Sequence, residues 1–304
     1  MFPLAAVIGA ATIAGVAAER RFVGRAEPLA RVLLSLLLWG FLPVIAFFNI
    51  AALELTVRIG AGIGFAYVAQ GATLLVAFLV GTHLLQLARP TVGALMLGAS
   101  HANTGPLGLP FVAALFGLGE LPNAVAFDVL VSVVWLVTIG FAIGAAFGTA
   151  ADTPRERVFV YFAKNPVLVA SVLGFLAPDV LAPDWAVRGS QLLVFASIPM
   201  AFFAIGVILA SEAGSGERLP SPLRNPALAW AIGLKLALPP AIMVALSYAV
   251  IEVPPSYIVL SAMGCGMSHV TVAATYGLDR GLAAAATAYT TALVLVVGVV
   301  IALL

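Results

Sequence analysis

Polar side chains and helix-breaking residues interrupt an apolar segment in the first half of the chain. The stretch GASHANTGPLG contains His101, Asn103 and Thr104 and continues with Gly105 and Pro106. Because proline and glycine weaken a helix, we expect the segment to break at its GPLGLP stretch. The amides that open the following half-helix carry partial positive charge. An anion could dock there, with the Asn103 amide and the Thr104 hydroxyl as uncharged donors.

A second apolar segment, residues 256–277, carries a similar interruption. Its small and polar residues are Gly264, Cys265, Gly266, Ser268 and His269. Two interrupted helices in corresponding halves of a chain indicate the binding site of a transporter. We therefore expect a substrate site between the two segments. For either helix alone, a kink that only shapes packing is the alternative.

Ionisable residues lie inside several of the apolar segments. Asp128 could carry a proton or bind a coupling cation, or it could accept hydrogen bonds at the outer mouth. Lys235 lies about two turns from one end of its segment, so we expect its amine to reach that surface, with attraction of an anion as the alternative. His101 and His269 could titrate near neutral pH, although neutral histidines bonded to a neighbour are the commoner case.

The composition sets the class of protein that holds these residues. Of the 304 residues, 63% are hydrophobic and 9% are charged, whereas soluble domains carry about 25% charged residues. This predicts an all-α polytopic membrane protein surrounded by the lipid bilayer. A net charge of +1 provides no basic surface for nucleic acid, and a single cysteine excludes a multi-cysteine metal site. Nucleotide-loop and protease motifs are absent, so we expect neither enzyme activity nor a cofactor.

Charges, prolines and glycines divide the chain into apolar segments, most of which are long enough to cross about 30 Å of hydrocarbon. The first segment is expected to be a retained helix and not a cleaved signal, because its arginines follow it. The ten predicted spans are residues 3–18, 29–52, 60–88, 91–118, 122–149, 160–178, 188–211, 227–251, 256–277 and 281–304.

The positive residues of the connections predict the orientation. With ten spans, nearly all lysines and arginines fall on one side, and only Arg58 and Arg188 fall on the other. Positive residues accumulate on the cytoplasmic side. The sequence thus predicts a bacterial-type inner membrane protein with both termini outside.

Two short sequences in the first half of the chain are weakly similar to two in the second half. FLPVIAFF from Phe41 resembles SIPMAFFA from Ser197, and LFGLGEL from Leu115 resembles TYGLDRG from Thr275. Five spans separate the copies, so the second copy must enter the membrane inverted, as in many secondary transporters. The expected repeats are residues 1–149 and 160–304.

Several of these motifs resemble a known family. NTGPLGLPFVAALFG, from Asn103, is similar to the NxGxxGxP…FG signature of the auxin efflux carrier family, which includes bacterial organic-acid permeases. NPVLVASVLGFL, SIPMAFFAIGVILA, KLALPP and the final YGLD…TAYTTAL block are similar to the family in the same order. The resemblance implies ten helices in two inverted five-helix repeats, like the bile-acid sodium symporters, with helices four and nine crossing at their breaks.

The resemblance also implies that the helices form a scaffold and a separate transport domain. Scaffold helices would be 3–18, 29–52, 160–178 and 188–211, and an elevator-like transport domain would comprise 60–149 and 227–304. In the plant carriers the substrate carboxylate lies near the crossing, beside an asparagine that matches Asn103. Their crossing prolines match Ala102 and Gly264 here, and their long cytoplasmic loop is reduced to 150–159. The predicted substrate-binding residues are Asn103, Thr104, Gly105, Pro106, Gly264, Cys265, Gly266 and Ser268.

Two functional interpretations follow. The first is a secondary carrier that moves small organic carboxylates, of the malate, malonate or indole type, by alternating access. The second is a symporter or antiporter coupled to H⁺ or Na⁺, with Asp128, His101 or His269 in the coupling role. The expected partners are the organic anion, the bilayer and a coupling ion; a homodimer is left open. A sensor is disfavoured by the short loops, and a channel by the lack of a charged ring or repeated pore loop.

Overall fold

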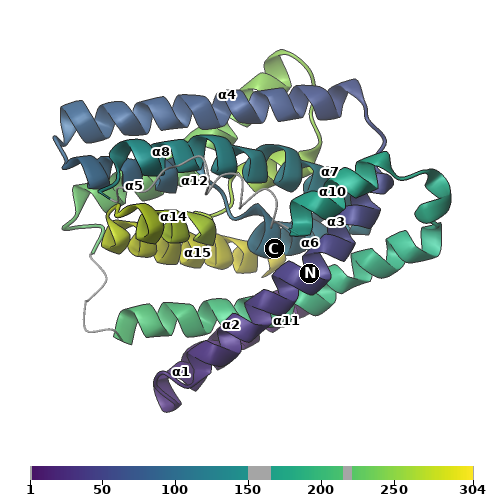
Figure 1. Ribbon diagram of the computed structural model, residues 1–304, viewed down its shortest axis with the longest axis horizontal. Coiled ribbons are helices and arrows are strands. Elements are labelled where there is room, and N and C mark those ends of the chain that lie inside the picture. Colours follow the sequence, from purple (N-terminus) through teal and green to yellow (C-terminus); the bar gives the residue numbers. More distant parts are fainter. Residues whose placement is uncertain (1, 150–165, 215–220, 304) are drawn as a thin grey trace.

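The computed structural model describes residues 2–149, 166–214 and 221–303 (Figure 1). Within these ranges most residues are helical and no β-strand forms, so the predicted all-helical class is confirmed. Several predicted features lie outside the described residues: the connection 150–159, Asn165 with the start of segment 160–178, and residues 215–220 of the polar connection after Glu212.

The helices follow the predicted segments closely. In chain order they are α1 (Phe2–Arg21), α2 (Ala26–Leu36), α3 (Leu42–Ala51), α4 (Val57–Leu79), α5 (Arg89–Ser100), α6 (Leu109–Phe116), α7 (Leu121–Phe127), α8 (Phe141–Phe147), α10 (Pro166–Leu176), α11 (Asp184–Gly214), α12 (Pro226–Ala249), α13 (Pro255–Ser261), α14 (Met267–Tyr276) and α15 (Arg280–Leu303). Wider π-helical turns join or extend several of them, at η1 (Leu37–Phe41), η2 (Val80–Leu84), η3 (Thr104–Gly108), η5 (Asp128–Val133) and η6 (Leu136–Gly140). Short 3₁₀ turns form at η4 (Leu118–Glu120) and η7 (Asp179–Leu181).

Six helical stretches in the described part of the chain are long and apolar enough to cross a membrane. Multiple helices of this kind indicate a multi-pass membrane protein. The stretches are Ala26–Ala51, Val57–Leu84, Leu118–Phe147, Asp184–Ile208, Pro226–Ala249 and Arg280–Gly298. Two shorter apolar helical stretches, Thr104–Phe116 and Pro166–Leu176, fall within the predicted segments 91–118 and 160–178.

Helices α1, α2 and α11 run together along one side of the molecule (Figure 1). Glycines bring α1 and α11 into backbone contact: a Cβ added at Gly15 would lie 2.1 Å from the Phe203 carbonyl oxygen, and one at Gly206 would lie 2.2 Å from the Thr12 oxygen. Small residues allow this close approach between membrane helices. The contact between α10 and α3 is similar, with Gly174 against the backbone of Phe47.

A second group of helices surrounds the two broken segments. Helix α12 packs against α4, α5 and α15, and α14 packs against α15. Side-chain caps define two of the helix starts, since Thr56 Oγ1 accepts the Ile59 amide before α4 and Asn225 Oδ1 accepts the Leu228 amide in α12. Such caps satisfy amides that have no intrahelical partner.

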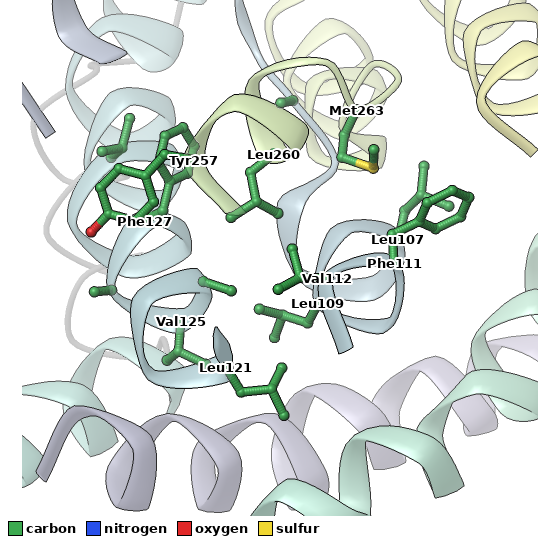
Figure 2. Close-up of a cluster of buried hydrophobic side chains, with 14 of the residues drawn as sticks. Leu107, Leu109, Phe111, Val112, Leu121, Val125, Phe127, Tyr257, Leu260 and Met263 are labelled. Atoms are coloured by element: carbon green, nitrogen blue, oxygen red, sulfur yellow. The ribbon is translucent and has the colours of Figure 1, made fainter. Parts of the chain in front are cut away.

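Apolar side chains join the two broken segments in the half of the molecule that holds α6, α7 and α13 (Figure 2). Leu260 of α13 lies beside Leu109 and Val112 of α6, and the rings of Tyr257 and Phe127 meet edge to face at 5.0 Å. The first half of one broken segment therefore packs against the second half of the other.

Candidate functional site

The first helix of the first broken segment ends earlier than we predicted. Helix α5 ends at Ser100, His101 is extended (φ −96°, ψ 125°), and the chain becomes helical again at Thr104. The expected break at the GPLGLP stretch is therefore wrong, because that stretch belongs to the second half-helix. Pro106 is tolerated there since the first amides of a helix have no intrahelical partner to lose.

The second broken segment opens between Ser261 and Met267, and the two breaks meet. Ala102 and Cys265 form an isolated antiparallel β-bridge. The Asn103 amide donates to the Gly264 oxygen at 2.8 Å, and the Gly266 amide donates to the His101 oxygen at 3.1 Å. Backbone groups cannot stay unpaired in hydrocarbon. Each break thus supplies the hydrogen bonds that the other lacks.

Side chains behind this bridge hold it in place. The Cys265 amide donates to Thr290 Oγ1 of α15, and its thiol donates to the Gly98 oxygen, both at 2.9 Å. A Cβ at Gly266 would lie 2.5 Å from the His101 ring, so a glycine is needed for the close approach. Residues Cys265 and Gly266 therefore keep the two extended segments in contact.

Lys235 does not reach the membrane surface, so the expectation that it does is wrong. Its side chain is 1% exposed, and Nζ donates to the Ser261 oxygen at 3.0 Å. Ser261 ends α13, where the carbonyl groups carry partial negative charge. The amine therefore supplies a hydrogen-bond donor to the end of the half-helix beside the break. The sequence placed Lys235 correctly along α12 but could not show that α13 covers it.

A cavity of about 150 Å³ opens at the meeting point of the breaks. Eight of the predicted site residues line it: His101, Asn103, Thr104, Gly105, Pro106, Asp128, Gly266 and Ser268. Leu42 of α3 and Val167 of α10 face the same space. The other four predicted residues, Gly264, Cys265, His269 and Lys235, are buried outside its lining.

Asp128 faces the first break. It lies in the π-helical turn η5 and accepts a hydrogen bond from the Thr104 hydroxyl. Its second oxygen lies 3.5 Å from where a Cβ on Gly105 would be, and its side chain is half-buried at the cavity wall. The carboxylate is therefore both anchored to the second half-helix and accessible from the cavity. Wide π-helical turns of this kind often occur at functional sites.

Three buried polar atoms of the cavity residues have no hydrogen-bond partner among the described residues. They are His101 Nδ1, Asn103 Nδ2 and Ser132 Oγ. Buried polar atoms are almost always hydrogen-bonded, so these unpaired atoms beside the cavity are candidates for contact with a ligand or water. Ser132 was missed in the sequence; its position one helical turn after Asp128 is the signal that could have found it.

A second cavity of about 240 Å³ lies where α2 and α11 approach α14 and α15. Its wall is mainly apolar, with Leu34, Ile205 and Ile208 on one side. Asn103 and Met267 line both cavities. The second cavity was not expected from the sequence, because it forms between helices that are distant along the chain.

Comparison with known proteins gives one informative similarity. No protein-family model matches the chain. Over 144 residues it is 26% identical to an uncharacterized transporter of Methanocaldococcus jannaschii, and the match covers 46% of each chain. The chain thus spans about half the length of the curated relative it matches. The apolar helices indicate a membrane protein, and the relative that the chain resembles is named as a transporter.

Proposed function

We propose that this protein is a secondary carrier of the auxin efflux carrier type, which moves small organic carboxylates across the inner membrane. The observation that carries the proposal is Asn103. Its side chain is 4% exposed, its Nδ2 has no partner among the described residues, and it lies where the breaks meet and the two cavities adjoin. A buried amide donor without a partner suits a carboxylate oxygen.

The two half-helices strengthen the site for an anion. Thr104 opens the half-helix that continues into α6, and Met267 opens α14. Both residues line the first cavity, so both helix starts, with their partial positive charge, lie at its wall. Because Thr104 already donates its hydroxyl to Asp128, Asn103 is the uncharged side-chain donor that remains at the start of this half-helix.

The proposed mechanism is alternating access. Helices one, two, six and seven of the ten proposed spans (3–18, 29–52, 160–178 and 188–211) would form the scaffold, and 60–149 with 227–304 would move against it. The close backbone contact between α1 and α11 suits a rigid scaffold. The proposal also includes two inverted repeats, residues 1–149 and 160–304, and places both termini outside. A homodimer built on the scaffold is compatible with it.

Carboxylate uptake by Asn103→Ala in proteoliposomes tests the site. We expect uptake to fall at least about tenfold, because a hydrogen bond to a charged group contributes about 1.5–3 kcal/mol, with no loss of thermal stability. Asn123→Ala is the matched control, since Asn123 bonds Glu120 and lines neither cavity; its uptake should equal that of the wild type. Undiminished uptake by Asn103→Ala would refute the proposed site.

A second candidate is a carrier coupled to H⁺ or Na⁺, as in the bile-acid symporter type. It is favoured by Asp128, a half-buried carboxylate at the wall of the same cavity. Carboxylates inside membranes commonly carry protons or bind cations. Uptake should then follow an imposed pH or Na⁺ gradient, and Asp128→Asn should abolish that dependence. Wild-type uptake that responds to neither gradient would exclude coupling.

A further inference from the structure

The boundary between the two cavities consists of two residues with related positions. Asn103 directly precedes the half-helix η3, and Met267 is the first residue of α14. They are the two residues shared by the linings of both cavities. Asn103 thus ends the first break, Met267 follows the second, and both face the two compartments. The Met267 side chain is half-buried at this boundary.

The compartments that meet at Met267 differ in chemistry. The first contains Asp128, Ser132 and Ser268 beside the exposed ends of the half-helices. The second is lined mainly by aliphatic side chains, with hydroxyl groups contributed only by threonines. The helix starts and serine hydroxyl groups of the first suit a carboxylate, whereas the second suits a hydrocarbon chain.

We propose that Met267 is a length filter, which closes the apolar cavity to the hydrocarbon tail of a carboxylate bound in the polar cavity. This inference rests on the proposed function, because it places the carboxylate beside Asn103. Methionine is unbranched and fills irregular gaps well. Because Met267 lines both cavities, its long side chain lies between the polar cavity and the space that a longer substrate would need.

The sizes of the cavities set the substrate class. The polar cavity, at about 150 Å³, is smaller than the roughly 300–1,000 Å³ sites that hold drug-sized ligands. Joined to the apolar cavity of about 240 Å³, it would reach the lower end of that range. The wild-type protein therefore selects short carboxylates, and a protein without the filter accepts longer aliphatic ones.

Removal of the filter should change the dependence of affinity on chain length. Burial of one methylene group tightens binding about fourfold. Purified full-length protein is titrated with acetate, butyrate, hexanoate and octanoate by calorimetry. In the wild type, we expect no gain beyond butyrate. In Met267→Ala, we expect hexanoate to bind at least about tenfold more tightly than butyrate.

Two variants separate the filter from a general change in the cavity. Val270→Ala enlarges the apolar cavity but leaves the boundary in place, because Val270 lines that cavity alone. It should keep the wild-type dependence on chain length. Met267→Leu conserves volume and should keep it too. If Met267→Ala does not yield folded protein, Met267→Val provides the same comparison with a smaller loss of volume.

The outcomes distinguish the filter from the proposed function. The same dependence on chain length in the wild type and in Met267→Ala would overturn the filter while leaving the carboxylate site intact. If no carboxylate binds the wild type, or if Asn103→Ala binds as tightly as the wild type, the proposed function fails and the filter fails with it.

Discussion

Two regions of this molecule bring helix backbones into contact, and they do so in opposite ways. Where α1 meets α11, Gly15 and Gly206 let two continuous helices touch, although Pro199 removes one hydrogen bond from the ladder of α11. Where the broken segments meet, the ladders are interrupted, and Ala102 pairs with Cys265 as in a β-sheet.

The difference shows how a membrane protein can combine a firm contact with an open site. The contact between α1 and α11 is filled by the helix backbones themselves, and a single added carbon has no room. The meeting of the breaks satisfies its backbone through His101 and Asn103 but leaves their side chains with unused hydrogen-bonding atoms beside a cavity. We infer that the first region holds the fold and the second is shaped for a ligand.

Gly206→Leu should have the largest effect on stability. Its first side-chain carbon would lie 2.2 Å from the Thr12 oxygen and 3.1 Å from the Val16 amide nitrogen. Backbone atoms cannot move aside as a flexible side chain can, so α1 must separate from α11. We expect a loss of at least about 3 kcal/mol, at the upper end of overpacking effects. Thermal unfolding in detergent measures it.

The control for this variant lies on the same helix. Gly189 of α11 has open space where its Cβ would be. Gly189→Leu should leave the melting temperature unchanged or slightly raised, because glycine weakens a helix. Equal effects of the two substitutions would show that the contact between α1 and α11 does not stabilise the protein in the way we infer.

The sequence was sufficient to predict the helical membrane class and the interruption of both segments. Apolar runs and clusters of glycine or proline are local features, readable without the fold. The position of the first break could not be predicted from the sequence, because the same Gly105–Pro106 pair fits the first turn of a half-helix as well as a gap between helices. The extended residues before it depend on a partner segment more than a hundred residues away.

Gly266→Ala should have an intermediate effect, which tests the other side of the comparison. The added carbon would lie 2.5 Å from the His101 ring and 3.0 Å from the Ala102 oxygen. The ring can turn, but the carbonyl is part of the paired backbone. We expect a loss of about 2 kcal/mol and a larger fractional loss of uptake in proteoliposomes, because the breaks must separate.

Gly233→Ala is the matched control for that substitution. Gly233 lies in α12, and the space that its Cβ would occupy is open. Replacement by alanine should be neutral or stabilise the helix by up to about 1 kcal/mol. If Gly266→Ala has the same small effect on both stability and uptake, close contact between the breaks is not needed for the site.

The candidate site was predictable in its residue types more than in its contacts. Asn103 and Asp128 stand out as polar residues inside apolar segments, and both line the cavity. Lys235 stands out for the same reason, yet its amine is bonded to Ser261 behind the break. Met267 carries no polar signal, so only the packing of the helices reveals its position between two cavities.

Thr290→Val should have the smallest of the three effects, although it too acts on the paired breaks. Thr290 Oγ1 accepts the Cys265 amide at 2.9 Å, and valine would leave that buried donor unpaired. We expect a loss of about 1 kcal/mol in thermal unfolding, the lower end of the penalty for an unsatisfied buried group. Thr287→Val, on the same helix, removes a hydroxyl that bonds the Ala283 carbonyl one turn away and should change stability less. A larger loss for Thr287→Val would mean that α15 supports the helix bundle and not the break.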